Sequence, residues 1–206
     1  IDVWNRAVRG RPARCVAAYS SLLERLPAYL QQLEMESLGK SVTREGAALA
    51  PARSGALVWG GRGSDLQHSV FQWLHQGQDE VPVDFIAIRD CEFTADPRAR
   101  ALNANLAAQG AALTQGQLGA PHHEIPGGRA SATLILQGLT PQSLGALIAL
   151  HEHKVAVEAA LYGLNPFDQF GVELGKGLAR AILAGDEARL DSTARDQAER
   201  LCRGQS

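Results

Sequence analysis

Two polar side chains near the end of the sequence have types and a spacing that could hold one ligand. Gln169 and Lys176 stand seven residues apart in PFDQFGVELGKGLARAIL, residues 166–183, whose apolar residues recur at helical spacing. Seven residues are about two turns, so the pattern predicts an amide and an ammonium group on one face of a helix. The predicted helix contains Gly171, Gly175 and Gly177. Each glycine destabilises a helix by up to about 1 kcal/mol relative to alanine.

Two other side chains stand where acid–base chemistry is possible. Glu36 lies in QQLEMESLGKS, at a predicted helix-to-loop junction before Gly39, where backbone can approach a ligand and a carboxylate can act as a base. A lone glutamate is more often only a solvated charge, so both interpretations stay open. His68 lies in a predicted helix behind the glycine-rich turn WGGRGSDLQH, residues 59–68, and is the best placed of the histidines.

The remaining histidines and Lys154 have simpler interpretations. His75 is predicted to be a partly buried structural histidine. His151 and His153 are two positions apart on a predicted helix, so they do not share a face and make a poor metal pair. Lys154 is predicted to be one member of a surface ion pair.

Composition narrows the class of protein. The chain has 206 residues, 45% hydrophobic and 20% charged, as expected for one globular domain or one domain and a tail. A formal net charge of −2 without a basic block does not favour non-specific nucleic-acid binding. No apolar run reaches the roughly 18 residues of a membrane-spanning helix, and no signal peptide is recognised. The sequence starts at Ile1 without a methionine, which fits a processed chain or a piece of a longer one.

Cysteine usage indicates a reducing compartment. The cysteines are widely spaced and odd in number, and no CxxC or Cys/His ligand spacing occurs, which argues against a zinc site and a disulfide scaffold. They are Cys15, Cys91 and Cys202. The cytoplasm is therefore the expected location.

The candidate residues need elements to position them, and the sequence predicts alternating strands and helices. The strands are continuous apolar runs, which is typical of a parallel sheet covered by helices on both faces. In such a sheet ligands bind beyond the carboxyl ends of the strands, and the turn at 59–68 is one such end. The predicted strands are 56–61, 81–88 and 132–139, and the predicted helices are 18–33 with a break or fresh start at Pro27, 64–77 with Ser64 as N-cap, 97–113, 141–161, 166–183 and 186–202.

Several segments resemble the glucose-6-phosphate isomerase family. LYGLNPFDQFGVELGK, residues 161–176, resembles most of a family signature: two apolar residues, four free positions, then aromatic-Asp-Gln-x-Gly-Val-Glu-x-x-Lys. The signature starts two residues earlier with Gly or Ser, and Ala159 takes that position here. LPAYLQQLEMESLGKSVTREG at 26–46 and VWGGRGSDLQHSVFQWLHQGQDEVPVDFIA at 58–87 resemble two further family segments. The similar segments follow one another in the family's order over nearly the whole chain.

The resemblance implies an α/β fold and a partial chain. The expected fold is a three-layer αβα sandwich with a mainly parallel sheet, of the sugar-isomerase, flavodoxin-like type, plus C-terminal helices. Residues 1–185 would form the family's second sugar-isomerase-type subdomain and 186–206 its C-terminal helical arm. The family's first subdomain, with most of its phosphate-binding residues and a catalytic arginine, has no counterpart in this sequence.

The resemblance also implies an activity and roles for five side chains. The family converts D-glucose 6-phosphate reversibly to D-fructose 6-phosphate through a cis-enediol, in glycolysis and gluconeogenesis, without metal or cofactor. Glu36 would be the base, while His68 and Lys176 would assist ring opening. Gln32 and Gln169 would line the sugar and phosphate pocket, and His68 would reach the active site of the partner in a homodimer.

Some positions depart from the family, which keeps a second interpretation open. Leu38 replaces asparagine beside the presumed base, and residues 61–66 differ at most positions. Leu66 replaces a glycine and limits backbone freedom, and Asp65 adds a negative charge where a sugar phosphate would approach. The alternative to an isomerase is a non-catalytic sugar-phosphate-binding module.

Overall fold

The computed structural model of the chain describes residues 1–89 and 97–202. Cys91 and residues 203–206 of the expected arm lie outside the described residues. The chain divides into two compact units, Ile1–Pro166 and Phe167–Ser206, and each is described by itself. This division falls earlier in the sequence than the implied boundary between residues 185 and 186.

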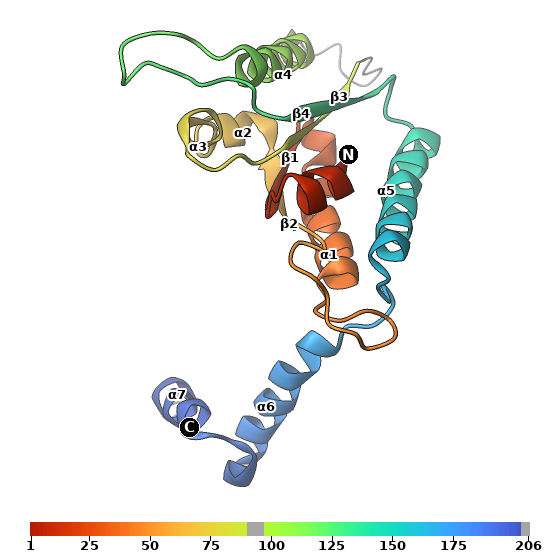
Figure 1. Cartoon of the computed structure of the whole chain (residues 1–206), viewed down its shortest axis with the longest axis vertical. Coiled ribbons are helices and arrows are strands. Elements are labelled where there is room, and N and C mark those ends of the chain that lie inside the picture. The colour runs from red at the N-terminus through yellow and green to blue at the C-terminus, as the bar shows by residue number, and fades with distance from the viewer. Residues whose placement is uncertain (90–96, 203–206) are drawn as a thin grey trace. The chain divides into compact units, whose positions relative to one another are not determined.

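The first unit is built around a parallel sheet of four strands in the order β2-β1-β3-β4. Helices lie on both faces of the sheet (Figure 1), so the predicted three-layer α/β fold is confirmed. The elements are η1 (Trp4–Val8), β1 (Ala13–Ala18), η2 (Ser21–Leu23), α1 (Leu26–Leu38), β2 (Leu57–Arg62), α2 (Gly63–Gln67), α3 (Phe71–Gln76), β3 (Val83–Ile88), α4 (Pro97–Gln115), β4 (Ser131–Leu136) and α5 (Pro141–Tyr162).

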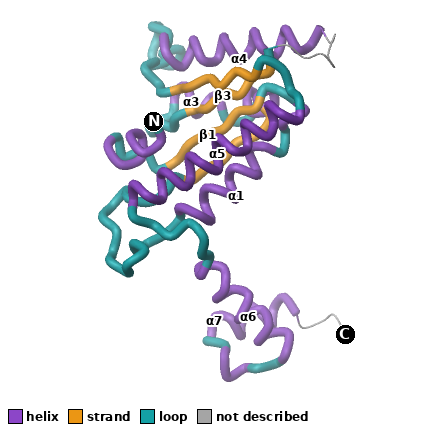
Figure 2. The backbone as a smooth tube through the Cα atoms, turned by 90° about the vertical axis from the view of Figure 1, so that its right-hand side faces the viewer, coloured by secondary structure: helices purple, strands orange, loops and turns teal. Residues whose placement is uncertain are grey.

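The side chains of the central strands alternate between two apolar cores, one on each face of the sheet. Cys15, Ala17 and Phe85 pack with side chains of α2, α3 and α4. Val16 and Ile86 pack with side chains of α1 and α5. Figure 2 shows α1 and α5 on one side of the sheet and α3 and α4 on the other. Because both faces of β1 and β3 are buried, apolar residues follow one another along these strands.

Strand β1 corrects the start of the predicted helix 18–33. Ala13–Ala18 is an inner strand of the sheet, and α1 begins only at Leu26. Arg14 obscures this strand in the sequence, since a charged residue interrupts its short apolar run. The fresh start at Pro27 is confirmed, because Pro27 lies in the first turn of α1, where the missing backbone donor is not needed.

The predicted helix 64–77 is two short helices, α2 and α3. The backbone leaves the helical region at Val70, with φ −122°, so the chain turns between them. Ser64 lies inside α2, and Arg62 occupies the N-cap position without a side-chain cap. The prediction of Ser64 as the N-cap is therefore wrong.

The long helices α4 and α5 begin where proline predicts. Pro97 opens α4 and Pro141 opens α5, where Thr140 and Ser143 form reciprocal capping hydrogen bonds. Across residues 1–89 and 97–202, no helix combines the length and apolar character needed to cross a membrane.

The second unit corrects the predicted helix 166–183. It contains the 3-10 turn η3 (Phe170–Val172), α6 (Glu173–Ala184), the 3-10 turn η4 (Glu187–Arg189) and α7 (Ser192–Cys202). Gln169 precedes η3 with φ −145° and ψ 44°, outside the helical region. Pro166 and Gly171 flank Gln169, and both residue types disfavour a helix interior. Gln169 and Lys176 are therefore not two turns apart on one helix, and the prediction of a shared helical face is wrong.

Candidate active site

Helix α1 presents Gln32 and Glu36 on one side, one turn apart. Gln32 Nε2 lies 3.4 Å from Glu36 Oε1, at the long end of hydrogen-bonding distance. Gln32 is exposed and Glu36 is half-buried. A carboxylate beside an amide can bind a hydroxyl group of a ligand and exchange a proton with it. The structure thus brings two of the predicted site residues together.

The opposite side of α1 is buried and fixes the helix in the first unit. Leu30, Glu34 and Leu38 recur every four residues and are all buried. Leu38 is only 1% exposed and packs with side chains of α5. Since residues two positions apart point about 200° apart on a helix, Leu38 points away from the side that carries Glu36. The departure from asparagine at this position therefore places an apolar side chain in the core.

Glu34 of α1 belongs to a buried charge cluster centred on Arg14 of β1. Arg14 Nη2 donates a hydrogen bond to Glu34 Oε2 at 2.6 Å, and Arg14 Nη1 donates to Asp84 of β3. Lys154 of α5 donates to Glu34 Oε1 at 2.9 Å and to Asp2 Oδ2 at 2.6 Å. The side chains of Arg14 and Glu34 are each 5% exposed. These charge-assisted bonds fix the rotation of α1 about its axis, and with it the direction of its exposed side.

His68 follows the carboxyl end of β2 and is exposed. It is the C-cap residue of α2, and its backbone N–H bonds to the Asp65 carbonyl at 3.2 Å. Asp65 accepts two hydrogen bonds from Arg62, each of 3.0 Å, which lower the pKa of the Asp65 carboxyl. Asp65 is a second departure from the family, and its negative charge is therefore balanced by Arg62. Leu66 is a third departure from the family, and its side chain is buried in the core.

Glu36 and His68 of one chain lie at opposite edges of the sheet. Helix α1 ends at the amino edge, where Gly55, just before β2, donates its N–H to the Leu38 carbonyl at 2.9 Å. His68 comes after the last residue of β2, at the carboxyl edge. A strand of six residues is roughly 17 Å long at about 3.3 Å per residue. The structure therefore does not bring these two side chains of the same chain around one small ligand.

Gln169 and Lys176 belong to the second unit, and both are exposed. Lys176 Nζ pairs with Glu173 Oε1 at 3.1 Å on the first turn of α6. An exposed pair of this kind stabilises by at most about 1 kcal/mol. An anionic ligand can therefore replace Glu173 at the Lys176 ammonium group with little loss.

The sequence contains a signal for the buried cluster, although it does not single out Arg14. Glu34 shares the four-residue spacing of its buried neighbours on α1, and a carboxylate on a buried stripe requires a cation. Lys154 is correctly predicted to form an ion pair, but the pair is not at the surface. Its side chain is 23% exposed and that of its partner Glu34 is 5% exposed.

The other histidines have structural surroundings. His75 is half-buried, with Nε2 2.9 Å from Gln109 Oε1, as predicted. His151 is buried and His153 is exposed, so the prediction that they do not share a face is confirmed. Among residues 1–89 and 97–202, no group of three or more His, Cys, Asp or Glu side chains could hold a metal ion.

Two buried groups of α5 beside the cluster have shifted pKa values. Burial raises the pKa of the Glu158 carboxyl to about 7, against the opposing attraction of Lys154. Burial lowers the pKa of His151 to about 4, and repulsion from Lys154 acts in the same direction. The surroundings therefore favour the neutral form of both side chains.

The pKa of Glu158 leads to an expected pH dependence of folding. Because its pKa is raised from 4.5 to about 7 on folding, its stabilising contribution is complete below about pH 4.5 and is lost as the pH rises through about 7. Glu158→Gln should remove this loss and so gain up to roughly 3 kcal/mol relative to the unsubstituted chain across that range. Urea unfolding of the 206-residue chain, followed by tryptophan fluorescence at several pH values, measures the difference.

The matched control is Glu152→Gln, at an exposed glutamate of the same helix. It should show no comparable change with pH. A difference between the Glu158→Gln variant and the unsubstituted chain that stays constant from pH 4 to pH 8 would contradict the buried, raised pKa of Glu158.

The fold and the candidate site define a class of protein: an α/β protein with a parallel sheet covered on both faces and polar side chains suited to a hydroxylated ligand. The sequence profile of the family described as Phosphoglucose isomerase matches residues 1–198. The chain belongs to the phosphoglucose isomerase family. The resemblance of its motifs to glucose-6-phosphate isomerases is thereby confirmed.

Relatives with assigned names are glucose-6-phosphate isomerases. The protein of Polaromonas naphthalenivorans (strain CJ2) is 48% identical over 206 residues, covering 98% of this chain and 39% of the relative. That of Stenotrophomonas maltophilia (strain K279a) is 50% identical over 186 residues, covering 88% of this chain and 36% of the relative. The chain thus spans less than two fifths of the length of these relatives.

Two solved structures have a fold similar to that of this chain. The crystal structure of a glucose-6-phosphate isomerase from Chlamydia trachomatis D/UW-3/Cx matches with a TM-score of 0.86 at 41% identity, over 94% of this chain and 38% of that chain. The crystal structure of a hypothetical protein from Thermus thermophilus matches with a TM-score of 0.70 at 25% identity, over 89% of this chain and 44% of that chain.

Proposed function

We propose that this chain is the part of a glucose-6-phosphate isomerase that carries the catalytic base. The whole protein would interconvert D-glucose 6-phosphate and D-fructose 6-phosphate in glycolysis and gluconeogenesis. The family match over residues 1–198 and the names of the relatives support this proposal. The observation that carries it is the position of Glu36, a half-buried carboxylate beside Gln32, on a helix whose other side is held in the core.

The proposed chemistry is a proton transfer within the substrate. Glu36 takes the proton from C2 of the open-chain aldose, and the electron pair of that C–H bond forms the double bond of a cis-enediol as the carbonyl oxygen gains a proton. The protonated Glu36 then returns the proton to C1, while the hydroxyl group on C2 gives up its proton and becomes the carbonyl of the ketose. One carboxylate can serve both steps because they are the reverse of each other. Gln32 would bind a sugar hydroxyl group beside the base.

Ring opening is assigned to His68 and Lys176, with Gln169 in the sugar-phosphate pocket. Because Glu36 and His68 of one chain lie at opposite edges of the sheet, a site that uses both takes them from two chains. This geometry supports a homodimer in which His68 reaches the partner's site. Residues 1–185 would form the second sugar-isomerase-type subdomain and 186–206 the arm, in a cytoplasmic enzyme whose ligands are sugar phosphates rather than nucleic acids.

A non-catalytic sugar-phosphate-binding module is the second candidate. The substitutions at residues 61–66 favour it, since they alter the turn before His68. The pairing of Arg62 with Asp65 counts against it, because this pairing balances the added charge within the turn. A pure binding module also has no use for Glu36.

An activity assay on two proteins tests the proposal. The isolated 206-residue chain is expected to have little or no isomerase activity, because most of the family's phosphate-binding residues lie outside it. A full-length chimera, in which this chain replaces the matched residues of the Polaromonas naphthalenivorans relative, should convert fructose 6-phosphate in a coupled assay. The unmodified relative is the control.

Two results would change this assignment. A folded chimera that binds fructose 6-phosphate by calorimetry without turnover would favour the binding module. Turnover by the isolated chain at the rate of the unmodified relative would show that the part outside these residues is not needed.

A further inference from the structure

One half of a sheet face in the first unit is covered only in part. On the face that carries α1 and α5, α1 packs on β1 and β2, and the main contact of α5 is with α1. On the other face, α4 packs on β3 and β4. Parallel sheets occur almost only with both faces covered. Within the described residues of the first unit, α5 covers the β3–β4 half of the first face through Leu147, near its start, and the covering layer there is incomplete.

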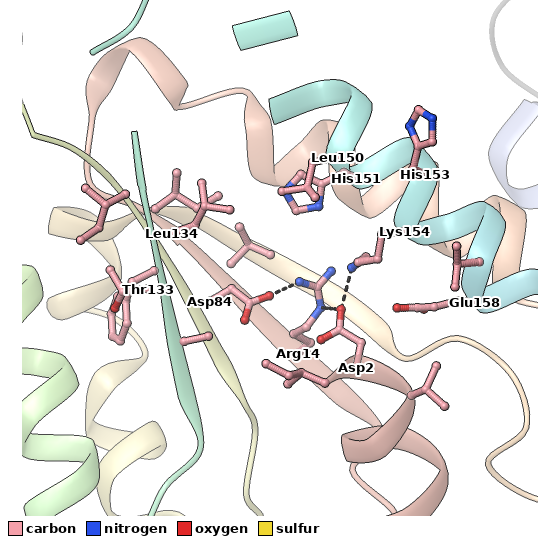
Figure 3. A pocket seen from close by; sticks show the side chains of 18 of the residues that line it. Asp2, Arg14, Asp84, Thr133, Leu134, Leu150, His151, His153, Lys154 and Glu158 are labelled. Atoms are coloured by element: carbon pink, nitrogen blue, oxygen red, sulfur yellow. Dashed lines mark hydrogen bonds and ion pairs between the residues drawn. The ribbon is translucent and has the colours of Figure 1, made fainter. Parts of the chain in front are cut away.

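An open cavity of about 820 Å³ marks this place, between β4 and α5. Its wall includes large apolar side chains of α5 that are more than half exposed: Leu150 at 51%, Val157 at 59% and Leu161 at 62%. Figure 3 shows Asp2 paired with both Arg14 and Lys154 at one side of the cavity. Exposed apolar surface next to such a cavity is typical of an interface for another segment of protein.

Two buried polar side chains of α5 face this cavity. His151 is 8% exposed and Glu158 is 7% exposed, and both line the cavity (Figure 3). Both ring nitrogens of His151 lack a hydrogen-bond partner within residues 1–89 and 97–202. Since buried polar groups are nearly always hydrogen-bonded, His151 points to a partner that lies outside these residues, and Glu158 lines the same cavity.

We propose that an amphipathic helix from the part of the isomerase chain outside these 206 residues occupies this cavity and places a polar side chain against His151 and Glu158. Helices are the elements that cover parallel sheets. The matched part is only 36% and 39% of two relatives, so most of their length lies elsewhere. Ile1, Asp2 and Val3 line the cavity, and residues joined to Ile1 in a longer chain would begin there. This inference rests on the proposed membership of a full-length isomerase and not on catalysis.

Cysteine labelling tests the proposal without an activity readout. Leu161→Cys and Val157→Cys are introduced singly, with Cys91 and Cys202 changed to serine and the buried Cys15 kept. In the isolated chain both new thiols should react rapidly with a maleimide. In the full-length chimera they should react roughly tenfold or more slowly, because a covered thiol reacts only through local opening.

The control is Ala156→Cys, which is exposed, lies beside Val157 and does not line the cavity, so its rate should change much less. Rapid reaction at positions 157 and 161 in a chimera with a cooperative thermal transition overturns the proposal. Slow reaction in the isolated chain also overturns the proposal. If the reaction rate then depends on protein concentration, a second copy of the chain covers the cavity. If the rate does not depend on concentration, the chain's own second unit covers it.

Isomerase activity is measured on the same chimera samples, so that the two proposals fail separately. Protected thiols without turnover contradict the proposed function alone. Turnover with unprotected thiols contradicts the proposed helix alone.

Discussion

Replacing Glu36 by glutamine is expected to lower the isomerase turnover of the full-length chimera by about 10²- to 10⁴-fold, the usual contribution of a general base. Glutamine has nearly the same shape and can still hydrogen-bond to Gln32, but it cannot accept a proton from carbon. Binding of fructose 6-phosphate should therefore survive. A coupled assay gives the turnover, and calorimetry gives the binding.

Proton exchange makes this experiment specific to the base. The unsubstituted chimera should exchange the transferred proton with solvent deuterium, and the Glu36→Gln variant should not. Glu45→Gln, at an exposed glutamate paired with Arg44, is the matched control and should keep normal turnover. Exchange at the unsubstituted rate in the Glu36→Gln variant would remove Glu36 from the role of base.

Replacing Arg14 by methionine is expected to destabilise the isolated chain by about 3–5 kcal/mol, the usual effect of breaking a buried ion pair from one side. Methionine fills much of the space of the arginine stem but leaves Asp84 without its cation and Glu34 with Lys154 alone. Urea unfolding at pH 7, followed by tryptophan fluorescence, measures the change in the free energy of unfolding.

Arg62→Met is the matched control, since it breaks an arginine–aspartate pair that is exposed. Its effect should be about 1 kcal/mol or less. Equal losses in the Arg14→Met and Arg62→Met variants would mean that the buried cluster does not hold α1 more firmly than a surface pair would.

Much of the fold follows from the sequence, and the missing parts have physical causes. The apolar runs of β2, β3 and β4 and the prolines that open α4 and α5 predict these elements correctly. Strand β1 is missed because Arg14 interrupts its apolar run, although the guanidinium is satisfied by Glu34 and Asp84 from distant segments. Local patterns do not contain such partners, which only the folded chain brings together.

The candidate site could be predicted only in part. The resemblance supplies the roles of the side chains, and the spacing of Gln32 and Glu36 agrees with the structure. A spacing of seven residues implies two turns only in a continuous helix, and η3 breaks that condition between Gln169 and α6. Glu36 and His68 lie at opposite edges because α1 follows β1 and runs back to the amino edge of the sheet. Without knowing that β1 precedes α1, the direction of α1 along the sheet cannot be predicted.

The buried cluster has a consequence for a chain that is still being synthesised. Lys154 bonds to Asp2 across 152 positions and to Glu34 across 120. When β1 to β3 have left the ribosome, Arg14 is the cluster's one cation among the described residues, against the carboxylates of Asp2, Glu34 and Asp84. Because contacts between residues so far apart in the chain form late, the centre of the fold keeps an excess of negative charge until α5 emerges. The first unit is therefore expected to reach its final packing only after Lys154 has been translated.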